Sequence, residues 1–512
     1  MHYYLYEFPM KRTLIFICFF FFYSVLVQAQ SFEEYKRQQQ VKYNNYVQKK
    51  TEEFRAYRDR INAEYADYMR KAWTYEEAQA AESFPKRPEP PKPVEKEPLI
   101  IPRFEPIPFG NVIVPHMPDN KKAEPIIPLD ELERLINTNP GELTEEVKPK
   151  EEVKPEEFTF NWCGQAWYVP LTNQHHFRLK SVQETDVADV WKILSEVKYA
   201  GIVAACLKIR DSYQLPDWGY LHFLEAMTNA FLSGKPNEAR LLEMFILAQS
   251  GYQVRIARSN GQLYLLVSSS GKIYEYSYMT LGGRKYYVVN KSSVRGSFFV
   301  YERDFPRAQP FKWQMNKLPL LAGEEQKRAL HGKSIPEVQT TVNINKNLVE
   351  FMNNYPRCND WNYYALASLS EQTKNGFYPA LQQSIEGKNK KEAVDILLGF
   401  VQTAFDYQTD QEQFGKERPL FGDETLYYPY CDCEDRSILF SILVRELLGM
   451  DVVLLDYPEH LATAVRFDDD VEGDYFMLDG KRYVVCDPTY IGSHVGEAMP
   501  KLKNTKATII KL

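Results

Sequence analysis

The chain of 512 residues is 44% hydrophobic and 14% aromatic, which is enough for two or three domains with apolar cores of their own. Its formal net charge is −7, and it has no long basic run that could neutralise phosphates, so composition argues against a nucleic-acid-binding protein. Seven cysteines, one of them in an apolar N-terminal run, are too few for a disulfide scaffold.

The N-terminal segment has the pattern of a secretion signal. An apolar run begins at Met10 with two basic residues and leads to Val27-Gln28-Ala29, a small-x-small cleavage pattern. The run is short for a membrane-spanning helix, which disfavours the alternative of a retained anchor. We therefore expect a signal peptide over residues 1–29, export to the periplasm or the medium, and no stable membrane span after cleavage.

Two further segments are expected before the globular part. Residues 30–82 predict a long polar helix, because apolar residues recur there at steps of three and four. This apolar face either forms a coiled coil through which the protein self-associates, or packs on the protein's own domain. Residues 83–157 are rich in Pro, Glu and Lys and predict an extended linker. The apolar face consists of Phe54, Tyr57, Ile61, Tyr65, Tyr68 and Ala72.

From residue 158 onward, helical and strand patterns alternate, which predicts an α+β fold with helices packed on antiparallel strands. Apolar periodicity predicts helices over residues 220–232, 238–250, 347–352, 391–405 and 436–448. Runs of β-branched and aromatic residues predict strands over residues 254–257, 263–267, 286–289, 452–455, 463–467 and 483–486.

A cysteine at a predicted helix start is the first candidate for chemistry. Cys433 follows Asp432, which can cap the helix, and Gly449 stands where that helix should end. A thiol at a helix N-terminus meets unpaired N–H groups and the positive end of the helix dipole, and both favour the nucleophilic thiolate. The flanking acidic residues oppose this effect, so a cationic partner is needed.

Two residues on predicted strands complete a candidate triad. His460 precedes the strand "LATAVRF", and Asp487 follows the strand "YVVC". A nucleophile on a helix, a base on one strand and an orienting carboxylate on the next strand form the arrangement of a catalytic triad. In these roles Asp487 would hold one tautomer of the His460 ring, and the ring would take the thiol proton.

These residues resemble a known family. The stretches "CDCEDRSILFSILVRELLG", "EHLATAV" and "VVCDPTY" are similar to motifs of the transglutaminase-like superfamily of papain-like cysteine enzymes, in its exported bacterial type. The resemblance implies a core helix on an antiparallel sheet over residues 301–512. It also implies that Cys433 is the nucleophile, His460 the general base and acid, and Asp487 the orienting residue.

The resemblance further implies an oxyanion hole and a cleft wall ahead of the nucleophile. The backbone N–H of the nucleophile would form part of the oxyanion hole, and Tyr428 and Tyr430 are candidates for a second donor. Tyr407, Asp410 and Glu424 are candidates for lining the cleft, because similar folds place an aromatic-rich loop there. An ordinary packed loop is the alternative.

Other readings of the cysteines remain open. Cys431, Cys433, His460 and Cys486 offer the atoms of a structural zinc site, although Cys-x-Cys with distant single ligands is a weak zinc pattern. In an oxidising compartment Cys486 could form a disulfide with Cys431 or Cys433, and a bond to Cys433 would switch the enzyme off. The triad could also belong to a binding protein that catalyses nothing. The enzymatic reading requires no metal and no cofactor.

The globular part contains a second, weaker copy of the same pattern. A shift of 198 residues (449 − 251) aligns the glycines that end the two helices and matches the apolar positions without a gap. The copy has Lys235, Gln262 and Asn290 where the motif has its three candidate catalytic residues. We interpret residues 158–300 as a degenerate transglutaminase-like domain that binds a substrate or partner. The alternative is that any helix–Gly–strand–strand unit would align this well.

Together these patterns predict an exported cysteine-dependent hydrolase, a peptidase or amidase that acts by acyl transfer through a thioester intermediate. Its substrate would be a protein, a peptide or a cell-wall amide. The alternatives are a non-catalytic binding or adaptor protein of the cell envelope and a protein-crosslinking transglutaminase.

Overall fold

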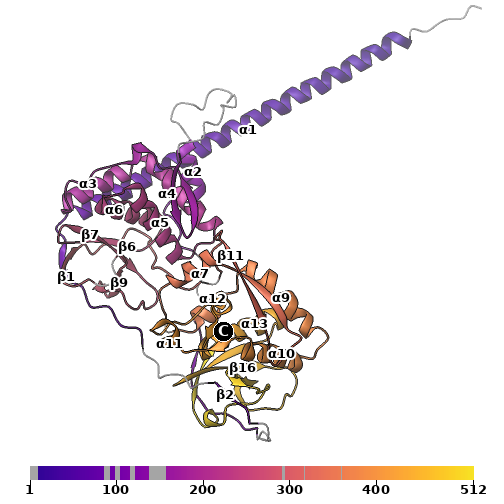
Figure 1. The fold of residues 1–512 in the computed structure, drawn as a ribbon. Coiled ribbons are helices and arrows are strands. Elements are labelled where there is room, and N and C mark those ends of the chain that lie inside the picture. The colour runs from indigo at the N-terminus through magenta and orange to yellow at the C-terminus, as the bar shows by residue number, and fades with distance from the viewer. Residues whose placement is uncertain are drawn as a thin grey trace, which may run out of the picture.

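The structure is a computed structural model that describes residues 10–85, 93–97, 104–115, 122–137, 157–290, 294–315, 317–358 and 360–512. It has a mixed α+β fold with a long N-terminal helix, a near-barrel antiparallel sheet and a curled half-barrel sheet (Figure 1). The α+β class expected from the sequence is confirmed. Within the described part of the chain, no helix combines the length and the apolar character needed to cross a bilayer.

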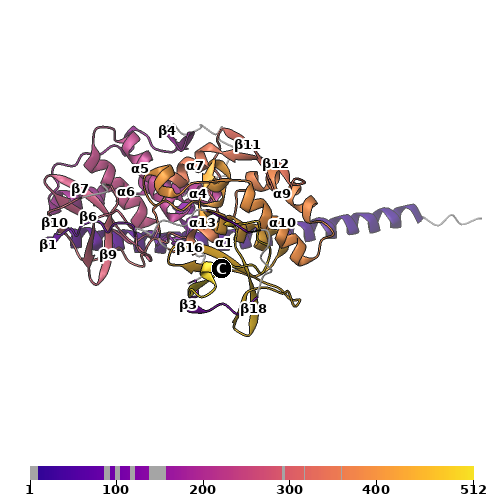
Figure 2. The ribbon, with the colours of Figure 1, turned by 60° about the horizontal axis from the view of Figure 1, so that its bottom comes forward.

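The long helix α1 (Met10–Met69) has two different halves. Residues 34–46 are exposed, and this half projects away from the rest of the protein (Figures 1 and 2). Near the other end Tyr65 is buried in the main apolar core, and Asn62 Oδ1 accepts a hydrogen bond from Trp191 Nε1 at 3.1 Å. The apolar face from Phe54 to Tyr68 therefore packs on the protein's own domain, while self-association through the projecting half stays a prediction. The helix ends at Met69 and not near residue 82, because residues 74–77 form a strand of the first sheet, and Ala72 of the expected face is exposed.

The first lobe comprises residues 157–315 together with the strand that follows α1. Its six-stranded antiparallel sheet nearly closes on itself, because Gln79 and Tyr278 form a bridge between the two edges. The strands in spatial order are β1 (Thr74–Glu77), β10 (Ser297–Val300), β6 (Val254–Ser259), β7 (Gln262–Ser268), β9 (Arg284–Val288) and β8 (Tyr278–Leu281). The other elements are β4 (Phe158–Trp162), β5 (Gln165–Val169), η1 (Asn173–His175), α3 (Glu184–Leu194), α4 (Val197–Ser212), α5 (Asp217–Phe231) and α6 (Pro236–Gln249).

The second lobe comprises residues 317–512 together with one strand from the N-terminal region. Its core helix packs on a sheet of six strands. The strands in spatial order are β3 (Phe109–Ile113), β20 (Ala507–Lys511), β15 (Val452–Tyr457), β16 (His460–Arg466), β18 (Lys481–Cys486) and β17 (Tyr475–Leu478). The helices are α7 (Lys346–Asn353), α8 (Asn362–Ala365), α9 (Glu371–Ile385), α10 (Lys390–Thr403), α11 (Asp410–Phe414), α12 (Gly422–Tyr427), the core helix α13 (Cys433–Leu448) and η2 (Pro500–Leu502). Short pairs are β11 (Glu325–His331) with β12 (Gln339–Asn345), β13 (Asp406–Tyr407) with β14 (Tyr430–Cys431), and β19 (Tyr490–Ile491) with β2 (Val94–Glu95).

The two sheets share one strand order. In each lobe a core helix leads into a hairpin, and the same shift of 198 residues (452 − 254) relates β6 to β15 and β7 to β16. The register agrees as well, since Val254 pairs with Val267 and Val452 pairs with Val465. Both core helices end at a glycine with positive φ, Gly251 at 91° and Gly449 at 63°, a conformation that L side chains rarely adopt.

The described parts of the predicted linker, residues 83–157, pack on both lobes. β2 pairs with β19 and β3 pairs with β20, while Ile107 and Ile126 are buried. The helix α2 (Leu129–Asn137) lies against α4 of the first lobe. The proline-rich part is extended as expected, but residues 129–137 form a helix, and the segment packs on both lobes instead of only spacing them apart. Residues 138–156 lie outside the described part, as do residues 1–9 of the predicted signal peptide, whose remainder forms the start of α1.

One apolar core runs through both lobes between the helices and the sheets. Each sheet also has a smaller core on its other face, such as Leu266 and Val288 in the first lobe and Leu455 and Val485 in the second. The central strands β7, β15 and β16 are mostly buried on both faces, so their sequences are largely apolar, which is why their patterns could be identified from the sequence.

Candidate active site

Cys433 is the first residue of α13, and Asp432 is its N-cap. The Asp435 carboxylate accepts a hydrogen bond from the Asp432 backbone N–H at 3.3 Å, which ties the first turn together. One turn further, Ser437 Oγ donates to the Leu461 carbonyl at 2.7 Å, so the start of the helix lies against β16. The Leu461 backbone amide is within hydrogen-bonding reach of the Cys433 sulfur. The structure thus brings the predicted nucleophile next to the strand that begins with the predicted base.

His460 and Asp487 are joined by a hydrogen bond between neighbouring strands. His460 is the first residue of β16, and Asp487 directly follows β18. His460 Nε2 donates to Asp487 Oδ2 at 2.9 Å, and the Thr489 backbone N–H donates to Asp487 Oδ1 at 2.9 Å. A carboxylate only accepts, so the neutral ring has its proton on Nε2 and its lone pair on Nδ1. His460 Nδ1 is buried without a hydrogen-bond partner among the described residues, so no hydrogen bond joins it to the Cys433 thiol.

The three predicted catalytic residues are enclosed. Cys433, His460 and Asp487 are each only 1% exposed. The segment of residues 404–432 packs over the start of α13, and within it the Leu420 backbone N–H donates to a carboxylate oxygen of the first helical turn at 2.9 Å.

The Cys433 thiol has acidic surroundings. Its sulfur donates a hydrogen bond to Glu434 Oε2 at 3.0 Å. Burial, followed by the charges of Glu434 and Asp432, raises the pKa of the Cys433 thiol well above its usual range. The thiolate expected from the helix dipole alone is therefore disfavoured, because burial and then the carboxylate charges outweigh the effect of the dipole.

Three buried carboxylates converge beside the nucleophile. Oxygen atoms of Asp410, Asp432 and Glu434 lie within 4.8 Å of one another. Asp432 Oδ1 is buried without a hydrogen-bond partner among the described residues, and burial together with mutual repulsion raises the pKa of Asp410 and of Asp432 well above the usual range. Such an all-oxygen set suits a hard cation such as Ca²⁺ or Mg²⁺. The sequence analysis placed Asp410 on the cleft wall but missed this cluster. The acidic residues on both sides of Cys433 were the local sign of it in the sequence.

Among the residues proposed for the cleft, Tyr407 lies near the nucleophile. It is in β13, which pairs with β14 just ahead of α13. Burial, followed by the charges of Cys433 and Asp432, raises the pKa of the Tyr407 phenol, which places the phenol near the thiol. Tyr428 Oη instead donates to Asn353 Oδ1 at 2.9 Å, so this oxyanion candidate is engaged elsewhere.

The other readings of the cysteines find no geometric support. Cys431, Cys433 and Cys486 are free thiols. Over the part of the chain that the structure describes, these cysteines and His460 do not converge as a set of three metal-ligand atoms. Burial raises the pKa of Cys431 to about 11 and that of Cys486 well above its usual range, which makes both poor nucleophiles.

The corresponding positions of the first lobe are occupied by non-catalytic side chains. Lys235 is the N-cap of α6. Gln262 is the first residue of β7 and is exposed. Asn290 Oδ1 accepts a hydrogen bond from the Leu265 backbone N–H at 2.7 Å, so this side chain stabilises strand β7.

Comparisons with protein-family models, with curated proteins and with solved structures find no match to this chain.

Proposed function

We propose that this protein is an exported cysteine-dependent hydrolase of the transglutaminase-like type, a peptidase or amidase that works by acyl transfer. The supporting observation is the His460–Asp487 hydrogen bond beside the helix turn that holds Cys433. The order and the elements of these residues support the same assignment, since a helix start, a strand start and the end of the adjacent strand are involved.

The reaction proceeds in two steps. The Cys433 thiol gives its proton to Nδ1 of His460 while the sulfur attacks a substrate amide carbonyl, and the Cys433 backbone N–H stabilises the oxyanion. The ring then gives this proton to the leaving amine, the C–N bond breaks, and a thioester remains on the sulfur. A water molecule next gives a proton to His460 as its oxygen attacks the thioester, which releases the carboxylic acid and returns the thiol. Asp487 holds the ring through Nε2 in both steps.

The substrate class follows from this chemistry together with the predicted export. An amide in a protein, a peptide or the cell wall is the proposed substrate. A crosslinking transglutaminase would form the same thioester and pass the acyl group to an amine instead of water, so the two activities differ in the acceptor alone.

A non-catalytic binding protein is the second candidate function. The burial of Cys433, which is 1% exposed, and the raised pKa of its thiol favour this alternative. In that case the triad would be a structural network, and the surfaces of both lobes would contact an envelope protein or glycan.

The test is a panel of peptide and cell-wall amides incubated with the wild type, with Cys433→Ala and with Cys358→Ala. Cys358 is a partly exposed thiol outside the candidate site, so its variant controls for general thiol effects. We expect release of amine by the wild type and by Cys358→Ala, and loss of release in Cys433→Ala. A fluorescent primary amine added to the same reactions reports crosslinking. Equal turnover in the wild type and Cys433→Ala, or none in any protein, would favour the binding protein.

A further inference from the structure

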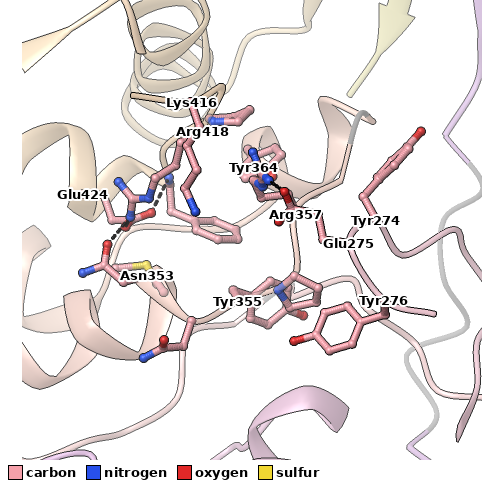
Figure 3. A pocket seen from close by; sticks show the side chains of 15 residues that line it. Tyr274, Glu275, Tyr276, Asn353, Tyr355, Arg357, Tyr364, Lys416, Arg418 and Glu424 are labelled. Carbon is pink, nitrogen blue, oxygen red and sulfur yellow. Dashed lines mark hydrogen bonds and ion pairs between the residues drawn. The ribbon is translucent and has the colours of Figure 1, made fainter. Parts of the chain in front are cut away.

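A polar cavity lies at the boundary between the two lobes, and none of the three predicted catalytic residues lines it (Figure 3). Its volume is about 200 Å³, which is room for roughly six water molecules. Three residues line it from the first lobe, namely Tyr274, Glu275 and Tyr276. The second lobe contributes residues 352–357, Tyr364 and five residues between Lys416 and Glu424. A molecule bound there would contact both lobes.

Three cationic side chains line this cavity. They are Arg357, Lys416 and Arg418, and their positive charges repel one another. Burial and then the charges of both arginines lower the pKa of the Lys416 ammonium. Lys416 itself is exposed and makes no hydrogen bond or ion pair with any residue that the structure describes. A cation without a partner beside two others is a site for an anion.

Carboxylates of the protein offset only part of this charge. Glu275 pairs with Arg357 across the lobe boundary, and Glu424 pairs with Arg418. Burial raises the pKa of Glu424 to about 7, so its negative charge is incomplete near neutral pH. Arg418 is only 9% exposed, and its Nη1 has no acceptor within the described part of the chain. The lining therefore keeps a net positive charge.

Aromatic rings form the remaining wall. Tyr274 and Tyr276 lie on the side opposite Lys416 and Arg418 in Figure 3. Tyr355, Tyr364 and Phe421 also line the cavity. Ring faces suit the carbon skeleton of an organic molecule, whereas a hydrated inorganic ion gains little from them.

We propose that this cavity binds a small organic carboxylate, whose anionic end meets Lys416 and the two arginines and whose carbon skeleton lies against the tyrosine rings. The site goes beyond the proposed hydrolase activity and does not depend on it, since binding there involves no bond chemistry. It is linked to the candidate active site by the chain itself, because the Arg418 backbone N–H donates to Asp410 Oδ2 at 2.5 Å.

The test is calorimetric titration of the full chain with glutarate, with its neutral isostere glutaramide and with inorganic phosphate at constant ionic strength. We expect saturable glutarate binding with a Kd of about 1 mM or below. Glutaramide should bind at least about tenfold more weakly, because it lacks the charge-assisted hydrogen bonds. Tighter binding of phosphate than of glutarate would overturn the assignment to a carboxylate.

Variants of Lys416 make the test specific. Lys416 is exposed, so Lys416→Gln should keep the fold, which circular dichroism verifies, and should weaken glutarate binding about tenfold. Lys416→Arg keeps the charge and should retain binding, and Lys506→Gln removes an exposed lysine outside the cavity and should change nothing. Equal affinity of the wild type and Lys416→Gln, or no saturable heat up to about 10 mM glutarate, would overturn the proposal.

Discussion

The two lobes have the same strand order in their sheets and differ in what precedes the core helix. In the first lobe residues 232–235 join α5 directly to α6. In the second lobe residues 404–432 separate α10 from α13 and contain α11, α12, β13 and β14. Because the hairpins agree in length and register, this segment is the main difference close to the candidate catalytic residues.

The strand that carries the predicted base starts in a different environment in each lobe. Gln262 begins β7 and is exposed, whereas His460 begins β16 and is buried. The segment of residues 404–432 supplies Asp410 and Asp432 to the acidic cluster. The first lobe therefore lacks both the segment ahead of the core helix and the three predicted catalytic side chains. The shared topology supports our proposal that the first lobe is a degenerate copy.

The largest expected effect comes from exchanging the corresponding strand residues. His460→Gln gives the second lobe the glutamine that the first lobe has at the corresponding position. It should lower the proposed amidase activity roughly 10²- to 10⁴-fold, because the proton acceptor is lost. The reverse change in the first lobe, Gln262→His, should leave activity unchanged. Steady-state rates of amine release from a cleaved substrate measure both. An unchanged rate in His460→Gln would remove the catalytic distinction between the lobes.

The next effect concerns the core that the lobes share. Leu241 in α6 and Leu439 in α13 occupy corresponding positions (439 − 198), and both are buried in the same apolar cluster. Each Leu→Ala change should cost about 2–5 kcal/mol of the free energy of unfolding, because a cavity is left in a packed core. Urea denaturation followed by circular dichroism measures the cost. Leu320→Ala, at an exposed leucine, is the matched control and should cost less than about 0.5 kcal/mol.

The shared apolar core also predicts that the two lobes unfold cooperatively. Since one core runs through both lobes, Leu241→Ala and Leu439→Ala should shift a single unfolding transition. Two transitions, with one variant moving the first and the other variant moving the second, would mean that the lobes unfold as independent units.

The part of the fold that could be predicted from the sequence depends on local patterns. The strands at residues 254–259 and 452–457 and the helix that begins near Cys433 follow from apolar runs and a terminating glycine. The His460–Asp487 contact could be anticipated as well, because neighbouring strands of an antiparallel sheet bring their ends together. The strand order repeated in both lobes agrees with the alignment at a shift of 198 residues.

The remainder depends on contacts between distant residues. The pairing of β3 with β20 joins residues about 400 positions apart, and a proline-rich segment gives no local sign of it. Asp410 meets Asp432 and Glu434 only through tertiary packing, and the closure of the site over Cys433 has the same origin. The cavity between the lobes is likewise assembled from three separate stretches of chain.

A smaller effect should follow from adding a cation, and it should depend on the second lobe alone. Ca²⁺ should raise the melting temperature, because it would relieve the repulsion between Asp410, Asp432 and Glu434, and a hundredfold excess over Kd would contribute about 2.7 kcal/mol. Asp432→Asn should abolish the Ca²⁺-dependent shift, whereas Asp469→Asn, at an exposed acidic residue, should retain it. A chelator should reverse the shift in the wild type. An equal Ca²⁺ response in Asp432→Asn and the wild type would exclude the cluster as the site.

The smallest expected effect is a pH dependence that belongs to the first lobe. Glu243 in α6 is buried beside Arg240, and the corresponding position of α13 is Ser441 (243 + 198). Burial raises the pKa of Glu243 from 4.5 to about 8. Between these values the native state keeps a proton that the unfolded state releases, so the contribution of this group to stability is complete below pH 4.5 and falls as the pH rises to about 8.

Glu243→Gln removes this titration. The free energy of unfolding of the variant, relative to that of the wild type, should therefore be higher at pH 8 than at pH 5. The Gln oxygen can still accept the hydrogen bond from Arg240, but the charge attraction that the ionised Glu243 has for Arg240 at pH 8 is lost and partly offsets the gain, which is why the net change is small. Ser441→Ala is the matched substitution in the second lobe, and it should show no pH-dependent difference because a hydroxyl does not titrate in this range. Urea denaturation of the three proteins at both pH values gives the comparison. A difference between Glu243→Gln and the wild type that is identical at pH 5 and pH 8 would show that Glu243 is ionised throughout and stabilised by Arg240, in which case its burial would not distinguish the two core helices.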